Sequence, residues 1–79
     1  MQPPSKTLDS LPPGVTARVV RVEGDDVIAE RLNDLGFWPG TEVSVLRRAL
    51  LGGPVAFFLQ GYRLALRRDE AARVVVSSS

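Results

Sequence analysis

Residues 32–43 of this 79-residue chain read LNDLGFWPGTEV, and this stretch predicts the end of a helix, a sharp turn and the start of a strand. Leu35 ends an apolar spacing that is typical of a helix. Gly36 follows it at the position where helices commonly end in a residue with positive φ, which glycine adopts without a steric penalty. Pro39 and Gly40 then predict the middle of a turn, because proline fixes one φ and glycine frees the next. The other elements are expected on either side of this break.

Two large aromatic side chains, Phe37 and Trp38, lie between the helix end and the turn, and Trp38 is the only tryptophan of the chain. Adjacent aromatic residues in a short loop are expected either to plug a small core or to form a contact surface. If Phe37 plugs the core, Trp38 is turned at least partly outward. The alternative is that Trp38 is an ordinary core residue, because tryptophan is highly buried on average.

One strand and one helix are predicted ahead of this stretch. Residues 17–23 predict a strand whose Ala17 and Val19 share one face with Arg21. Residues 27–35 predict a helix with a single apolar stripe, formed by Ile28, Leu32 and Leu35.

Two aspartates, Asp25 and Asp26, precede this helix. At that end a carboxylate accepts N–H groups that have no partner within the helix, and it complements the positive end of the helix dipole. Glu23, Asp25 and Asp26 are also weak surface candidates for holding a divalent cation, but they lack the regular ligand spacing of a calcium loop. Capping is therefore the preferred interpretation, and neither a metal site nor a cofactor is predicted.

A hairpin is predicted after the turn. Its strands cover residues 41–49 and 55–59, and Gly52-Gly53 closes it because adjacent glycines tolerate the positive φ values of tight turns. Ala56 and Phe58 lie on the opposite face of the second strand, which predicts either an inner strand that is apolar on both faces or an exposed Phe58 that is available to a partner. The inward set of that strand is Val55, Phe57 and Leu59.

Beyond the hairpin the pattern predicts, in chain order, a strand over 62–67, a helical turn over 68–72 and a strand over 73–76. Another short helical turn is predicted over residues 7–11. Residues 1–6 are expected to be a disordered leader and 77–79 a frayed tail, which leaves one domain over 7–76.

Five short strands with one helix inserted after the first predict a mainly β fold, a small and partly open antiparallel barrel. Closing a sheet on itself hides strand edges that would otherwise favour aggregation. The residues expected to be structural are Gly14, Leu32, Leu35, Gly36, Gly40 and Gly61.

The composition excludes several classes of function. The chain has no cysteine and no histidine, so it offers no disulfide, no thiolate or imidazole metal ligand and no histidine acid or base. No nucleophile stands beside a base, so we do not expect an enzyme. No apolar run approaches the roughly 20 residues that span a bilayer, and the first residues lack the apolar core of a signal peptide. We expect a cytoplasmic protein that does not insert into the membrane.

The net charge is +1, but the charges are unevenly distributed. Residues 1–40 carry a net charge of −2 and residues 41–79 a net charge of +3. The second half contains the arginines that could form one positive patch if their strands are neighbours: Arg47, Arg48, Arg63, Arg67 and Arg68. A solvated sheet face is the simpler interpretation, and the one we prefer.

A nucleic-acid-binding barrel is an alternative function, because small barrels with arginines and exposed aromatic residues bind single strands by charge and stacking. Against it, the net charge is near zero and the phenylalanines lie in apolar rather than basic surroundings. No nucleic acid partner is therefore expected.

Three motifs in this chain resemble the successive signatures of the FeoA family, the small cytosolic component of bacterial ferrous iron transport: LDSLPPG at 8–14, LNDLGFWPGTEV at 32–43 and GYRLALRRDEA at 61–71. The resemblance implies an SH3-like barrel with an inserted helix. It also implies an accessory role for FeoB, the membrane protein that carries a GTPase domain and conducts Fe²⁺. The chain departs from the family pattern at Trp38, where a smaller aliphatic residue is expected. The same fold occurs as the C-terminal domain of iron-dependent repressors, so a stand-alone relative of that domain is the other interpretation.

The cytosolic region of FeoB is therefore the expected partner. Binding energy concentrates in a few aromatic and arginine side chains, so we expect Trp38 to anchor the contact and the arginines to steer it. A weak or metal-bridged homo-oligomer is left open. The residues expected at the partner surface are Phe37, Trp38, Pro39, Arg47, Arg48, Phe58, Tyr62, Arg63, Arg67 and Arg68.

Overall fold

The computed structural model describes residues 6–48 and 50–78. The strands are β1 (Lys6–Thr7), β2 (Thr16–Val22), β3 (Glu42–Arg48), β4 (Val55–Leu59), β5 (Tyr62–Leu66) and β6 (Val74–Ser78). The α-helices are α1 (Val27–Asp34) and α2 (Arg68–Ala71), and two 3-10 helices cover Leu8–Ser10 and Leu50–Gly52.

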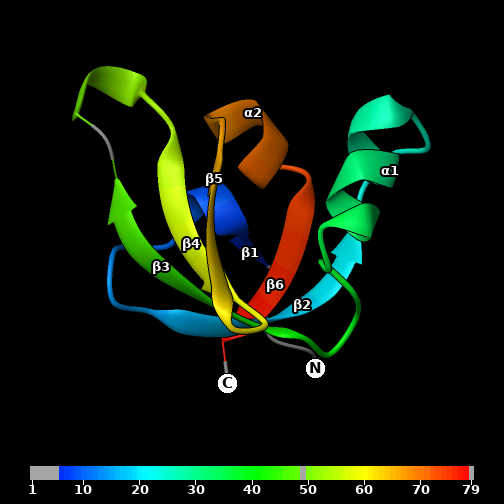
Figure 1. Ribbon diagram of the computed structural model, residues 1–79, viewed down its shortest axis with the longest axis horizontal. Coiled ribbons are helices and arrows are strands. Elements are labelled where there is room, and N and C mark those ends of the chain that lie inside the picture. Colours follow the sequence, from blue (N-terminus) through cyan, green and yellow to red (C-terminus); the bar gives the residue numbers. More distant parts are fainter. Residues whose placement is uncertain (1–5, 49, 79) are drawn as a thin grey trace.

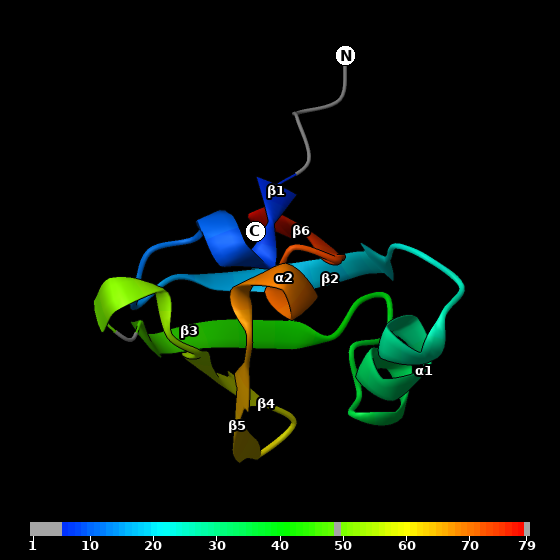
Figure 2. The same cartoon turned by 90° about the horizontal axis from the view of Figure 1, so that it is seen from above.

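All six strands form one antiparallel sheet in the order β1-β6-β2-β3-β4-β5. The sheet curls around the core, with α1 standing beside the strands and α2 lying over one end (Figure 1, Figure 2). Within the described residues no pairing joins β1 to β5, so the barrel remains open between them. The prediction of a mainly β, partly open barrel with one inserted helix is confirmed. The two-residue strand β1 was not predicted.

The core lies inside the curled sheet and is closed by the end of α1, by the 3-10 helix Leu8–Ser10 and by α2. Its largest fully buried side chains are Phe37 and Phe57. The predicted inward set of β4 is confirmed, because Val55, Phe57 and Leu59 are all buried. Burial of these apolar side chains is the main source of the stability of a domain this small.

One bulge in β2 and another in β3 change which side chains of these strands face the core. In β2 the pairing with β6 shifts between Val19 and Arg21, so Ala17 and Val19 are buried but Arg21 is exposed and Val22 packs against the core. The prediction that Arg21 shares the face of Ala17 and Val19 is therefore wrong, because an extra residue in a strand inverts the alternation after it.

The connection between β3 and β4 also differs from the prediction. Gly52-Gly53 does not close a tight hairpin, because a 3-10 helix at Leu50–Gly52 stands between the strands. Positive φ occurs at Leu51 and Gly52. At the chain ends, Lys6 belongs to β1 and β6 runs to Ser78, while the rest of the predicted leader, residues 1–5, and residue 79 lie outside the described residues.

Across the described part of the chain, no helix is both long enough and apolar enough to cross a membrane.

Candidate functional site

The end of α1 is built as a Schellman motif around Gly36. This glycine has a φ of 107°, and its N–H donates to the carbonyl of Asn33 at 3.1 Å. The N–H of Phe37 donates to the carbonyl of Leu32 at 3.2 Å. Both bonds satisfy carbonyls that the helix itself leaves without partners. The predicted helix end at Gly36 is confirmed.

The adjacent side chains of Phe37 and Trp38 differ in burial. Phe37 is 1% exposed and belongs to the core, so it leaves no surface for a partner. Trp38 is 48% exposed, and its indole Nε1–H donates to the carbonyl of Asn33 at 2.7 Å. Trp38 is therefore a surface residue that is held in place by the end of α1, and Pro39 beside it is also exposed.

The loop that carries Trp38 is fixed to β2. The N–H of Thr41 donates to the carbonyl of Trp38 at 3.0 Å, which closes the predicted turn, and Gly40 within it has a φ of 90°. The N–H of Gly40 donates to the carbonyl of Val19, and the N–H of Val19 donates to the carbonyl of Thr41, each at 2.8 Å. An aromatic side chain on such a braced loop loses little conformational freedom when it binds a partner.

Tyr62, the first residue of β5, is bonded to the same end of α1. Its hydroxyl donates to the carbonyl of Leu35, so β5 is tied to the end of α1. The tyrosine ring remains 39% exposed. Tyr62 therefore has a structural role as well as an exposed face.

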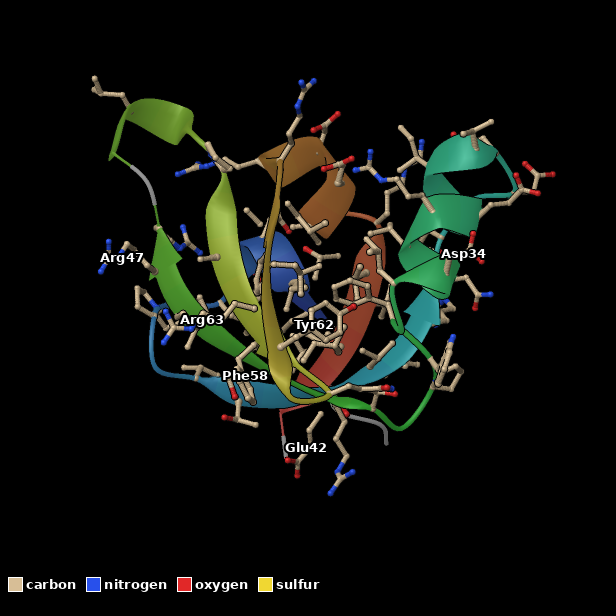
Figure 3. The ribbon with its side chains drawn as sticks, viewed as in Figure 1. Asp34, Glu42, Arg47, Phe58, Tyr62 and Arg63 are labelled. Carbon is tan, nitrogen blue, oxygen red and sulfur yellow. The ribbon has the colours of Figure 1, made fainter. Side chains whose placement is uncertain are left out.

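The outer face of the sheet over β3, β4 and β5 carries an exposed aromatic and two arginines (Figure 3). Phe58 is 42% exposed and lies directly opposite Arg63 of β5. Arg47 lies opposite Ala56, because the bulge in β3 after Val45 turns it to the outer face. Arg47 and Arg63 line one shallow hollow of about 370 Å³, together with Leu46 and Ala56.

The remaining arginines do not join this surface as one patch. Arg48 lies opposite Val55, a residue on the inward side of β4. Its Nη2 donates to the carbonyl of Leu11 at 2.6 Å and to the carbonyl of Asp9 at 2.7 Å. Its role is therefore to hold the segment between β1 and β2. Arg67 and Arg68 are exposed at the start of α2, where they line a different hollow. Arg48 therefore does not form a patch with Arg47 and Arg63, because neighbouring residues of a strand point to opposite faces.

Two of the three acidic residues before α1, Glu23 and Asp26, form ion pairs within the fold, while Asp25 is exposed. Asp26 caps the helix, since its carboxylate accepts the N–H of Ala29 at 3.2 Å, and the Arg73 guanidinium donates to both of its oxygens at 2.7 Å. Arg73, and to a lesser degree the N–H of Ala29, hold the pKa of the Asp26 carboxyl well below its usual range. Glu23 pairs with Arg21 at 3.4 Å. Among the described residues, no group of three or more acidic, histidine or cysteine residues is placed to hold a metal ion.

Sequence reasoning missed one buried charge. Glu70 is only 7% exposed, and one of its oxygens accepts the N–H of Arg67 at 2.9 Å, while the other pairs with Arg31 of α1. Glu70 thus caps α2 and ties the two helices together. The acidic residue in the first turn of α2 was a visible capping signal, but no local pattern indicates its pairing with Arg31.

Comparison with known proteins identifies the family. The FeoA domain model matches residues 6–78. The Fe(2+) transport protein A/Fe(2+) transporter FeoB fusion protein of Porphyromonas gingivalis is 38% identical over 69 residues, which are 87% of this chain and 8% of the fusion protein. The chain thus spans a small fraction of the length of this relative.

Solved structures agree on the fold. FeoA from Stenotrophomonas maltophilia, an SH3 domain protein solved in complex with zinc, is 39% identical, with a TM-score of 0.81 over 91% of this chain and 89% of its own. A manganese-dependent transcriptional repressor has a TM-score of 0.87 at 21% identity, over 100% of this chain and 44% of its own, and this likeness concerns the fold alone. The fold is therefore SH3-like, and the chain belongs to the FeoA family, which is linked to ferrous iron transport.

Proposed function

We propose that this chain is a non-enzymatic accessory protein of ferrous iron uptake that binds the cytosolic region of FeoB by protein–protein contact. The observation that carries the proposal is the Porphyromonas gingivalis relative, in which a FeoA sequence similar to this chain and a FeoB transporter form one polypeptide. Covalent fusion keeps two domains at a high effective concentration, an advantage that matters when the separate domains act together.

Trp38 supports the proposal as the anchor of the contact. Tryptophan is enriched among the few residues that supply most of the binding energy of an interface. Trp38 is about half exposed, and its indole is held by Asn33 on a loop that is braced against β2. A rigid, exposed aromatic side chain suits an anchor because little entropy is lost when it is buried.

Arg47 and Arg63 support an acidic partner surface. Both are exposed, and neither pairs with a carboxylate among the described residues. Positive side chains at the rim of an interface raise the rate of encounter with a negative partner more than they raise affinity. We assign Arg47 and Arg63 this steering role.

A contact function rather than catalysis fits the use of the charged groups. Asp26 and Glu70 are occupied by arginines and by helix N–H groups, so they hold the fold together instead of facing a substrate. The sequence supplies neither histidine nor cysteine for acid–base or nucleophilic chemistry.

Iron uptake tests the proposal. Fe²⁺ uptake is measured in cells that carry this chain's cognate FeoB, with and without the chain, in the cytoplasm where the proposal places it. We expect the uptake rate to change when the chain is removed and to return when it is supplied again. An uptake rate that is the same in both cells, at equal FeoB levels, would contradict the proposed function.

A further inference from the structure

The turn between β4 and β5 determines which backbone groups of β5 face outward. Gln60 and Gly61 form a two-residue turn with φ values of 49° and 85°, the signs of a type I′ hairpin. In such a hairpin the flanking residues, Leu59 and Tyr62, exchange backbone hydrogen bonds, and bonded and non-bonded pairs then alternate along the strands. The N–H and C=O groups of Arg63 and Ala65 therefore point away from β4.

Among the described residues no other strand pairs with this edge, and the tie from β5 to α1 is made by the side chain of Tyr62, at the turn end of the strand. β5 is the last strand of the sheet, and among the described strands only β4 pairs with it. Arg63 and Ala65 are both exposed, and the pairing of β5 with β4 continues without a bulge from Tyr62 to Leu66. β5 contains no proline. An edge strand without a bulge and without proline is a template on which another strand can pair.

The side chains beside this edge favour an acidic occupant. Arg63 lies on the outer face of β5, opposite Phe58, and Arg47 lines the same hollow from β3. Neither guanidinium has a carboxylate within salt-bridge distance in the part of the chain that the structure describes. A strand added at the edge would bring its own outward side chains next to Arg63 and to the exposed ring of Phe58.

A second copy of this chain is a poor occupant. The only charge within β5 is that of Arg63, and Arg67 follows just after the strand. Pairing two copies through this edge would align two strands that carry positive charges alone, and like charges on neighbouring strands are destabilising. The occupant expected from the charges is a different, acidic chain.

We propose that the free edge of β5 receives an extended acidic segment of the partner as an added strand. The backbone groups of Arg63 and Ala65 supply the hydrogen bonds, Arg63 and Arg47 pair with acidic side chains on the outer face, and Phe58 packs against them. Backbone bonds of this kind give affinity, and the alternate side chains give specificity. The identity of the partner as FeoB rests on the proposed function, whereas the chemistry of the segment follows from this chain alone.

A synthetic peptide tests the chemistry of the edge directly. The isotopically labelled chain is titrated with a heptapeptide that alternates valine and glutamate, which places every glutamate on one face of a strand. We expect NMR shift changes centred on the amides of Arg63 and Ala65, and slower hydrogen exchange of these two amides. A heptapeptide of alternating valine and lysine, and a scrambled valine–glutamate peptide, should bind at least about tenfold more weakly. Shift changes centred elsewhere, or none at millimolar peptide, would overturn the inference.

Two pairs of variants separate backbone from charge. Ala65→Pro removes one outward N–H without touching a bond to β4, and proline is tolerated at such edge positions. It should weaken peptide binding about tenfold, the equivalent of about one hydrogen bond, while Ala65→Val, which keeps the N–H, should bind as the parent does. Arg63→Glu should abolish preference for glutamate over lysine peptides, whereas Arg21→Glu on β2 should not. Equal binding by Ala65→Pro and Ala65→Val, each shown to be folded by its amide spectrum, would contradict the proposed strand addition.

The same variants distinguish this inference from the proposed function. If the cytosolic region of FeoB binds the parent and Ala65→Pro equally well, the proposed function stands and strand addition at β5 is wrong. If the acidic peptide binds at the edge but FeoB does not bind the chain, strand addition stands and FeoB is the wrong partner.

Discussion

Arg73 and Asp26, which lie 47 positions apart in the sequence, form a bidentate ion pair in which Nη1 and Nη2 of the guanidinium each donate to one carboxylate oxygen at 2.7 Å. The same carboxylate caps α1 through the N–H of Ala29. One side chain therefore fixes the start of the helix to the residue that precedes β6.

We expect Asp26→Asn to lower the urea midpoint of unfolding and to reduce its dependence on pH. The folded pKa of Asp26 is depressed below the ordinary value of 3.8 that applies to the unfolded chain. The stabilisation is therefore fully present above that value and is lost as the pH falls below it toward the folded pKa. Unfolding curves between pH 2 and pH 6 measure this. Asp25→Asn is the matched control, and equal acid sensitivity of Asp26→Asn and the parent would show that the ion pair contributes nothing.

Gly36→Val should destabilise the fold by about 1–3 kcal/mol, because a β-branched residue is strained at a φ of 107°. Strain in the backbone is the expected cause, since a Cβ at this position would itself meet no atom closer than 3.6 Å. Gly36→Ala should lose less, because alanine has no γ-carbons and is less restricted at positive φ than a β-branched residue. Urea unfolding at pH 7 compares the three proteins, and parental stability of Gly36→Val would mean that the helix does not depend on this end.

Trp38→Ala should change stability modestly. The ring is about half exposed and gives up one hydrogen bond to Asn33, a net loss of about 0.5–1.5 kcal/mol, with a smaller contribution from the lost packing. A tryptophan that filled the core would cost about 3–5 kcal/mol instead. Thermal and urea unfolding of the variant decide between these values. A loss in the larger range would place Trp38 among the residues that hold the core together.

The isolated chain should not bind Fe²⁺ tightly through its own residues. Without histidine or cysteine, only carboxylates, carbonyl groups and water can serve as ligands, and these favour hard and weakly held ions. Anaerobic titration calorimetry with Fe²⁺ measures this, with Mg²⁺ as the comparison ion. A stoichiometric site of micromolar affinity would contradict the prediction, whereas an ion that bridges surface carboxylates of two molecules in a crystal would not.

Local patterns predicted the helix end at Gly36, the cap at Asp26 and the inward side chains of β4, because each depends on neighbours within a few residues. The bulges in β2 and β3 were not predicted, because a bulge is defined by the pairing of two strands and the sequence of one strand does not show it. As a result, the orientation of Arg21 was misassigned and Arg48 was grouped with arginines from which it is separated.

Contacts between distant segments were also invisible in the sequence. The pairing of Arg31 with Glu70 and the bond from Tyr62 to Leu35 depend on the curl of the sheet, which brings α2 and β5 next to α1. Trp38 illustrates the same limit, because its exposure depends on Phe37 filling the core. Of the residues expected at the partner surface, Phe37 is buried and Arg48 is bonded within the fold, and neither placement could be predicted from local pattern.

Direct binding to FeoB tests the central claim. The purified chain is titrated into the isolated cytosolic region of its cognate FeoB by calorimetry, alongside Trp38→Ala and Val27→Ala, a matched change of an exposed apolar residue. We predict saturable one-to-one binding that Trp38→Ala weakens about tenfold or more and Val27→Ala leaves unchanged. The absence of saturable binding between the two folded proteins, at concentrations well above those in the cell, would contradict the proposal that the chain binds FeoB.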